Sequence, residues 1–203
     1  MKLFSKFLFK LFSFLYPCKI YGYENMIKDG CVVTCNHFRF VDSLFIYKIC
    51  GKDGNILCKK EVFKTKLVAG IVKDFNAIPI TREKPQINEL LNCINVLKSN
   101  KKLIIFPEGT RNKTKDNNLQ KIKSGAGFFA IKSRKPVVPV MIYKRSRMFK
   151  KTYILIGKPF YLSEFYDAKL DKATSDKIDG IIYNEMVKTH NELKSIVENN
   201  RKW

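Results

Sequence analysis

Short apolar runs rich in β-branched residues alternate along this chain with segments in which apolar residues recur at helical spacing. The runs that predict buried strands are 30–35, 76–80, 102–106, 136–142 and 152–156. Helical spacing is clearest from Ile87 to Leu97 and from Ile178 to Val197. This alternation favours a single-domain α/β fold with a mixed, largely parallel sheet that is flanked by helices. In such folds the loops at the strand ends carry the chemistry.

The charge of the chain limits its partners. Its 39 Lys and Arg against 18 Asp and Glu give a formal net charge of +21, while 45% of the 203 residues are hydrophobic. That much apolar material can bury a core, so a disordered polycation is excluded. A folded, strongly basic protein concentrates anions near its surface, which favours nucleic acid, anionic lipid headgroups or phosphorylated substrates. The motifs must decide among these classes.

Residues 1–16, MKLFSKFLFKLFSFLY, form a segment ahead of the α/β domain, which we expect over 17–203. Lys2, Lys6 and Lys10 recur every fourth residue among Phe and Leu, which predicts an amphipathic helix. The segment is shorter than the roughly 20 apolar residues that span a bilayer, and no signal-peptide cleavage site follows it. We expect an interfacial anchor with its lysines among anionic headgroups. The alternative is a helix packed on the domain's own core.

A strand-to-helix loop directly after the run 30–35 carries His37 and Asp42, five residues apart. A histidine near neutrality can remove a proton from a hydroxyl, and a carboxylate on its other ring nitrogen fixes the tautomer and stabilises the imidazolium. No protein nucleophile is needed if the substrate supplies the hydroxyl. On its own, such a pair is more often a helix N-cap beside a satisfied polar residue, so the other motifs decide.

A second loop follows the run 102–106 and reads FPEGTR. It places a carboxylate, Glu108, a flexible glycine, Gly109, and a guanidinium, Arg111, just beyond the carboxyl end of a predicted strand. This combination is more specific than the histidine and aspartate alone.

Together the two elements resemble the glycerolipid acyltransferase family, in particular its 1-acyl-sn-glycerol-3-phosphate acyltransferases. The marks of that family are an NHxxxxD element, here 36–42, and a later FPEGTR element, here 106–111. The blocks occur in the family's order, and the resemblance covers roughly residues 18–160.

Two further blocks of the family are present. One lies at 76–82, where Asn76 replaces the usual glycine; asparagine tolerates left-handed dihedral angles better than most residues. The other matches 123–125 and the Val-Pro strand at 136–140.

The resemblance implies direct acyl transfer from a thioester to the free hydroxyl of a 1-acyl-sn-glycerol 3-phosphate, giving phosphatidic acid. At the matching positions His37 would be the general base, and Asp42 would orient it and stabilise its charge. Arg82 and Arg111 would bind the acceptor's phosphate through bidentate contacts, with Lys59 as a weaker third candidate. Substrate binding or loop positioning is expected of Asn36, Glu108, Gly109 and Thr110. Glu108 would either bind the acceptor or hold the loop by ion pairing.

We expect no metal, because the six cysteines include no CxxC pair and only two histidines are present. The resemblance implies no cofactor. The acyl donor would be acyl-CoA or an acyl-carrier protein. Because a lysophosphatidate acceptor and its product both partition into a bilayer, we expect a peripheral, monotopic protein on the cytoplasmic face of the cell membrane. No nucleic acid partner is expected.

Other functions stay open at this stage. Within the enzyme class the acceptor could be glycerol 3-phosphate or another lysolipid. From a different class, a non-catalytic basic module that binds anionic membrane or nucleic acid would fit the charge, but it leaves both motif loops unexplained.

The segment 144–151 carries a run of positive charges without an acid, interleaved with aromatic and apolar residues. One interpretation is a second contact surface, for anionic lipid or for an acidic acyl-carrier protein. The alternative is a solvated hairpin.

Overall fold

Seven strands form one sheet in the order β1-β7-β6-β2-β5-β3-β4. The computed structural model describes residues 3–81, 84–114, 118–123 and 125–199. The strands are β1 (Cys18–Tyr21), β2 (Cys31–Cys35), β3 (Gly54–Lys59), β4 (Ala77–Ile80), β5 (Lys102–Ile105), β6 (Val137–Ile142) and β7 (Thr152–Ile156). All neighbouring pairs are parallel except β6 and β7, which are antiparallel. The predicted mixed, largely parallel α/β sheet is therefore confirmed.

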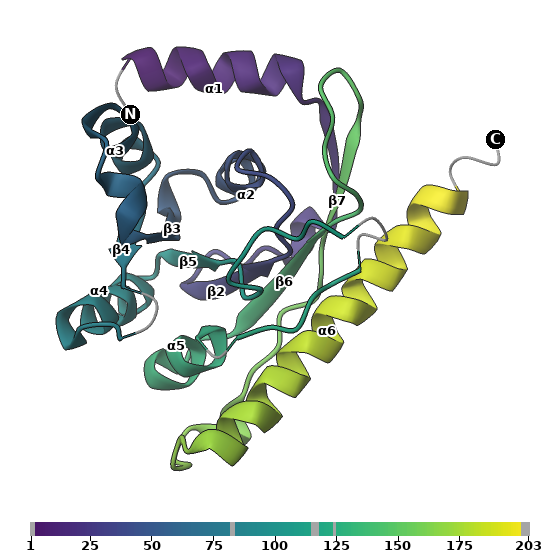
Figure 1. Cartoon of the computed structure of the whole chain (residues 1–203). Helices are drawn as coiled ribbons and strands as arrows, with labels where there is room; N and C mark the ends of the chain where they lie inside the picture. The colour runs from purple at the N-terminus through teal and green to yellow at the C-terminus, as the bar shows by residue number, and fades with distance from the viewer. Residues whose placement is uncertain (1–2, 82–83, 115–117, 124, 200–203) are drawn as a thin grey trace.

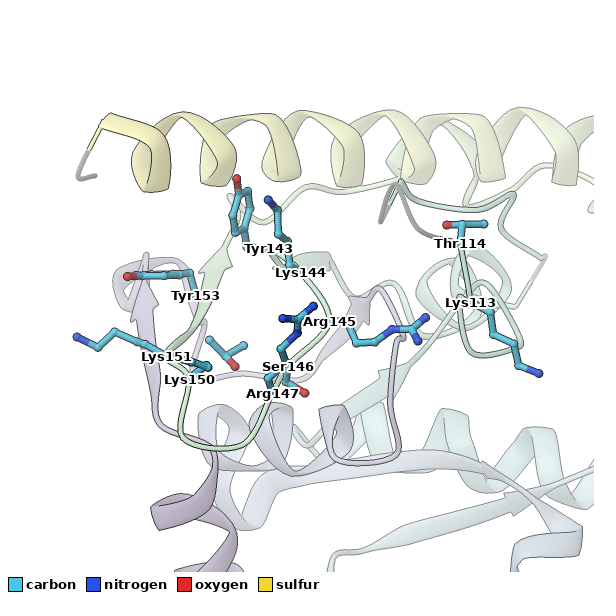
Figure 2. Close-up of a pocket in the computed structure, with 11 residues that line it drawn as sticks. Lys113, Thr114, Tyr143, Lys144, Arg145, Ser146, Arg147, Lys150, Lys151 and Tyr153 are labelled. Atoms are coloured by element: carbon cyan, nitrogen blue, oxygen red, sulfur yellow. The ribbon is translucent and has the colours of Figure 1, made fainter. Parts of the chain in front are cut away.

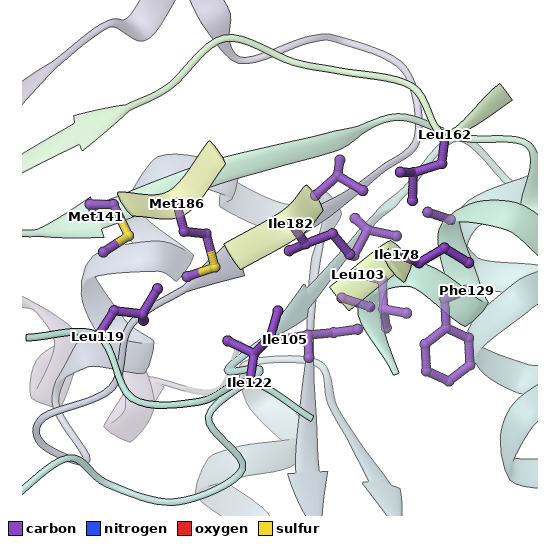
Figure 3. Packing of buried hydrophobic residues seen from close by; sticks show 14 of the residues in the cluster. Leu103, Ile105, Leu119, Ile122, Phe129, Met141, Leu162, Ile178, Ile182 and Met186 are labelled. Carbon is purple, nitrogen blue, oxygen red and sulfur yellow. The ribbon is translucent and has the colours of Figure 1, made fainter. Parts of the chain in front are cut away.

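The helices cover both faces of this sheet (Figure 1). They are α1 (Leu3–Leu15), α2 (Asp42–Cys50), α3 (Lys66–Asp74), α4 (Ile87–Lys98), α5 (Ala126–Ser133) and α6 (Lys172–Asn199). One buried cluster lies under α1, α2 and α3, and the other lies under α4, α5 and α6. Figure 3 shows the second cluster, where Leu103 and Ile105 of β5 face Ile178 and Ile182 of α6. Their neighbour Ile104 faces the first cluster, as the two-residue repeat of a strand requires.

Five of the seven strands were predicted from the sequence. Each of the five predicted runs contains a strand whose bounds lie within one residue of the expected ones. The strands β1 and β3 were not predicted. Both carry polar residues, and β1 is a four-residue strand, so neither has the continuous apolar run that indicates a buried strand.

The amino-terminal helix α1 has two apolar sides. One side packs on the core, where Phe12 is buried against Phe45 with ring centroids 5.0 Å apart, and Ser5 Oγ donates a 2.6 Å hydrogen bond to Asp74. The other side leaves Phe7 and Phe14 62% and 72% exposed. The helix thus packs on the domain and still presents an apolar surface outward. Within the described ranges, no helix is long and apolar enough to cross a membrane.

The sheet order brings the two motif loops together. The strands β2 and β5 pair in parallel, so the loops that follow Cys35 and Ile105 leave the same edge of the sheet side by side. On either side of this pair, β6 and β3 end at the same edge. A site at this edge can therefore collect residues from four strands.

The contact of α5 with α6 provides a stability test. A Cβ atom at Gly127 in α5 would overlap Cγ2 of Ile178 in α6, whereas one at Gly180 in α6 would have open space. Replacing glycine by alanine inside a helix stabilises the fold by roughly 0.5–1 kcal/mol, whereas overpacking a core destabilises it by about 1–3 kcal/mol. We expect Gly127→Ala to lower the free energy of unfolding by about 1 kcal/mol and Gly180→Ala to raise it slightly, as measured by urea denaturation. Equal effects of both substitutions would contradict this packing.

Candidate active site

Asn36 ties the first motif loop to the sheet. Its Nδ2 donates a 2.9 Å hydrogen bond to the carbonyl of Ile142, and the amide of Ile142 donates a 2.8 Å bond back to its Oδ1. The side chain is buried, so these bonds replace the strand pairing that β2 and β6 lose at their ends. Of the two roles expected for Asn36, the geometry supports loop positioning.

His37 and Asp42 form the contact that their spacing suggests. The Nδ1 atom of His37 lies 3.2 Å from Oδ2 of Asp42. The same carboxylate oxygen accepts 2.6 Å hydrogen bonds from the backbone amides of Phe38 and Arg39, and Asp42 is fully buried. These amides stabilise the charged carboxylate away from water. An Nδ1–H donated to Asp42 leaves Nε2 as the ring nitrogen that can accept a proton.

The second motif loop holds His37 on three sides. The ring of Phe106 stacks on the imidazole with centroids 4.1 Å apart. The backbone amide of His37 donates a 2.8 Å hydrogen bond to Oε1 of Glu108, and its carbonyl accepts a 2.6 Å bond from the amide of Asn112. The position of the imidazole is therefore fixed by both loops together.

Glu108 is a loop-positioning residue in this geometry. Its second oxygen accepts a 3.2 Å hydrogen bond from the amide of Gln120, so its carboxylate joins three segments of chain. Burial raises the pKa of Glu108 above its ordinary value, although the donated amide bonds act in the opposite direction. Ion pairing was the mechanism expected for loop holding, but the bonds that hold the loop here come from backbone amides.

The imidazole opens onto a cavity of about 920 Å³. The polar residues that line it include Thr110, Arg111, Lys59, Lys123 and Asp179. The rest of the wall is largely apolar and includes Ile56, Leu57, Val62, Ile80, Leu90, Ile105, Phe128, Phe129, Leu170 and Ile178. His37, in contact with Asp42, thus lines a hollow whose wall combines cationic and apolar side chains.

The predicted phosphate ligands are only partly brought together. Arg111 and Lys59 line the cavity, and Lys59 lies 3.4 Å from Glu61 in an ion pair whose two side chains are about half exposed. Arg82 lies outside the described residues. Lys123 lines the same cavity and was missed, although it stands in a block that the sequence had already singled out.

Gly109 has the backbone that its place in the motif suggests. Its φ is +68°, in the left-handed region that favours glycine. A Cβ atom here would also lie 3.1 Å from Cδ of Lys123, so the absence of a side chain at Gly109 lets the Lys123 side chain lie close to the loop backbone. Thr110 follows at the exposed rim of the cavity.

Asn112 is the positioning residue that the sequence did not indicate. It is fully buried, its amide bonds to His37, and its carbonyl accepts a 2.8 Å hydrogen bond from Nη2 of Arg145. Its place directly after FPEGTR was the only available signal.

Comparisons with known proteins identify the family of the chain. A family model described as Acyltransferase matches residues 17–143. A 1-acyl-sn-glycerol-3-phosphate acyltransferase of Bacillus subtilis is 32% identical over 72% of this chain and 75% of its own length, and one of Cocos nucifera is 30% identical over 84% and 55%. The chain thus spans three quarters of the bacterial relative but about half of the plant one.

A solved structure shares the fold. The crystal structure of the 1-acyl-sn-glycerophosphate acyltransferase PlsC of Thermotoga maritima superposes with a TM-score of 0.65 at 20% identity, covering 95% of this chain and 76% of that one. The family match extends over more than half of the sequence, including both motif loops and the four strands whose ends form the site. The chain belongs to the acyltransferase family.

Proposed function

We propose that this protein transfers an acyl chain from an acyl thioester to the free hydroxyl of a 1-acyl-sn-glycerol 3-phosphate, giving phosphatidic acid. The observation that carries the proposal is the contact of His37 with Asp42 beside a cavity that His37 lines, whose other lining is divided between exposed cationic side chains and a largely apolar wall. That division suits an amphiphile with a phosphate at one end and an acyl chain at the other. Relatives that carry this activity in their names support the choice of acceptor.

The reaction needs no acyl-enzyme intermediate. Nε2 of His37 accepts the proton of the acceptor's hydroxyl as its oxygen attacks the thioester carbonyl. The C–S bond then breaks, and the imidazolium returns the proton to the departing thiolate. Asp42 stabilises the imidazolium between these steps, and its buried bonds to the amides of Phe38 and Arg39 keep it in place.

The acceptor's phosphate binds at the cavity mouth in this proposal. Arg111 presents a guanidinium that can pair bidentately with phosphate, and Lys59 and Lys123 add positive charge at the same hollow. Long acyl chains then lie against the apolar wall. The thiol carrier of the donor, coenzyme A or an acyl-carrier protein, stays outside the apolar part, and no further cofactor takes part.

Access to lipid substrates requires a position on a membrane. The outward side of α1 carries Phe7 and Phe14, and Lys6 and Lys10 on the same helix are exposed. Such a helix lies in the interface with aromatic side chains at the acyl boundary and lysines near anionic headgroups. We therefore place the protein peripherally on the cytoplasmic face of the cell membrane.

The acceptor is tested by assaying purified protein with lysophosphatidate and with glycerol 3-phosphate, each with acyl-CoA and with acyl-carrier protein as donor. The proposal expects phosphatidic acid from lysophosphatidate and little transfer to glycerol 3-phosphate, which lacks the acyl chain that fits the apolar wall. Preferential acylation of glycerol 3-phosphate would overturn it.

His37→Ala should lower the rate of transfer on the order of 100- to 10,000-fold, because it removes the general base. Asp42→Asn should also lower the rate strongly, since it loses the charge that stabilises the imidazolium. His190→Ala is the matched control, because His190 is the chain's other histidine and lies on α6. Steady-state assays on variants with native circular dichroism check this, and a folded His37→Ala protein with normal turnover would remove the mechanism.

Arg111→Ala should raise the KM for lysophosphatidate about tenfold to a hundredfold and leave the KM for the donor nearly unchanged. The loss corresponds to one charge-assisted contact of roughly 1.5–3 kcal/mol. Arg134→Ala serves as the control, because Arg134 pairs with Asp167 on the surface and does not line the cavity. Equal KM values for Arg111→Ala and wild type would show that the phosphate binds elsewhere.

The double substitution Phe7→Ser with Phe14→Ser should weaken sedimentation with anionic vesicles by on the order of tenfold or more. Each exposed ring would otherwise gain about 1.5–3 kcal/mol from burial in the acyl boundary. The control is Leu91→Ser with Tyr161→Ser, which removes two side chains that are 49% and 64% exposed outside α1. If both double variants bind vesicles equally, α1 is not the anchor.

A further inference from the structure

A second hollow lies beside the active site and shares no lining residue with the His37 cavity. It has a volume of about 650 Å³. Figure 2 shows that its walls come from the β6–β7 hairpin on one side and from Lys113 and Thr114 on the other. The proposed acyl transfer makes no use of it.

The hollow is strongly basic. Its cationic lining residues are Lys113, Lys144, Arg145, Arg147, Lys150 and Lys151. None of the described residues that line it is acidic, and within the described part of the chain no carboxylate forms an ion pair with its lysines. Cations gathered in a concave site at this density favour an anionic ligand, and phosphate matches both Arg and Lys.

Two hydroxyl groups in the lining strengthen this assignment. Oγ of Ser146 and Oγ1 of Thr152 are buried and have no hydrogen-bond partner among the described residues, and both residues line the hollow. Buried hydroxyls are normally paired. A phosphate bound in the hollow would supply acceptors for both.

The rim of the hollow indicates where the phosphate comes from. Beyond Arg147 the hairpin ends in Met148 and Phe149, which are 49% and 63% exposed. The amide of Phe149 donates a 2.7 Å hydrogen bond to the carbonyl of Leu15, and its ring meets that of Phe14 at 6.1 Å, edge to face. The exposed apolar side of α1 therefore continues onto the hairpin, which lies at the end of α1 (Figure 1), and Arg147 and Lys150 on either side of Met148 and Phe149 line the basic hollow. A lipid has this arrangement, with a charged headgroup above its acyl chains.

We infer that the hollow between the β6–β7 hairpin and residues 113–114 binds the phosphate of an anionic lipid headgroup, separately from the acceptor's phosphate in the active site. The inference rests on the proposed membrane association of α1. Arg145 reaches from the hairpin to the carbonyl of Asn112, and the amide of Asn112 holds the carbonyl of His37. A headgroup in the hollow thus fixes the catalytic loop relative to the bilayer that supplies the acceptor.

Two variants of the full chain test the site. Arg147→Glu with Lys150→Glu lowers the formal charge of its lining from +6 to +2, and Ser146→Ala with Thr152→Val removes only its hydroxyls. The charge control is Lys28→Glu with Lys101→Glu, which makes the same change in net charge at exposed positions just before β2 and β5, away from the catalytic edge. Binding is measured by sedimentation with phosphatidylcholine vesicles, with and without phosphatidylglycerol, and by titration with coenzyme A as a soluble phosphate ester.

The charge variant should lose binding to phosphatidylglycerol vesicles by at least about tenfold, and the hydroxyl variant by several-fold without loss of thermal stability. The control pair should bind as wild type does. Transfer to lysophosphatidate in detergent micelles should stay within about twofold of wild type for every variant, so a failure of the proposed function would appear as inactive wild type and not as altered vesicle binding.

Three results would overturn the inference. If the charge control loses as much vesicle binding as the charge variant, only diffuse attraction is at work. If the hydroxyl variant binds phosphatidylglycerol vesicles as wild type does, the hollow is not the site of contact. If both test variants lose coenzyme A binding while vesicle binding is unchanged, the phosphate comes from a soluble ester and not from a headgroup.

Discussion

The parallel pairing of β2 with β5 in the middle of the sheet is the constraint on which the site depends. It places the loops after Cys35 and Ile105 at one edge of the sheet. There the ring of Phe106 stacks on the imidazole of His37, and Glu108 accepts a hydrogen bond from the backbone amide of His37. Neither loop could hold the imidazole alone.

Burial of charge is the main cost of the arrangement. Asp42 is fully buried and Glu108 nearly so, and a buried carboxylate without partners is strongly unfavourable. Asp42 receives two backbone amides and the imidazole, while Glu108 receives two amides from different segments. The bonds that stabilise these carboxylates also fix the loops around His37, although Oδ1 of Asp42 is buried without a hydrogen-bond partner among the described residues.

The sequence predicted the parts of this fold whose signal is local. Continuous apolar runs located β2, β5 and β6, and motif spacing located His37, Asp42 and the 106–111 loop. It could not locate β3, whose polar ends break the run, nor the role of Asn112, which depends on contacts with residues far away in the chain. For α1 it left two hypotheses, packing on the core or anchoring at a membrane; one side of the helix packs on the core and the other side is exposed.

The central claim is direct transfer from thioester to acceptor hydroxyl by a histidine base. The most direct test follows thiol release from a long-chain acyl-CoA by the purified protein, with and without lysophosphatidate. Intact-protein mass spectrometry on the same samples shows whether the protein becomes acylated. The account predicts that thiol and phosphatidic acid form in equal amounts, only when the acceptor is present, and that the protein mass never increases by an acyl group. Rapid thiol release without acceptor, accompanied by an acylated protein, would contradict it.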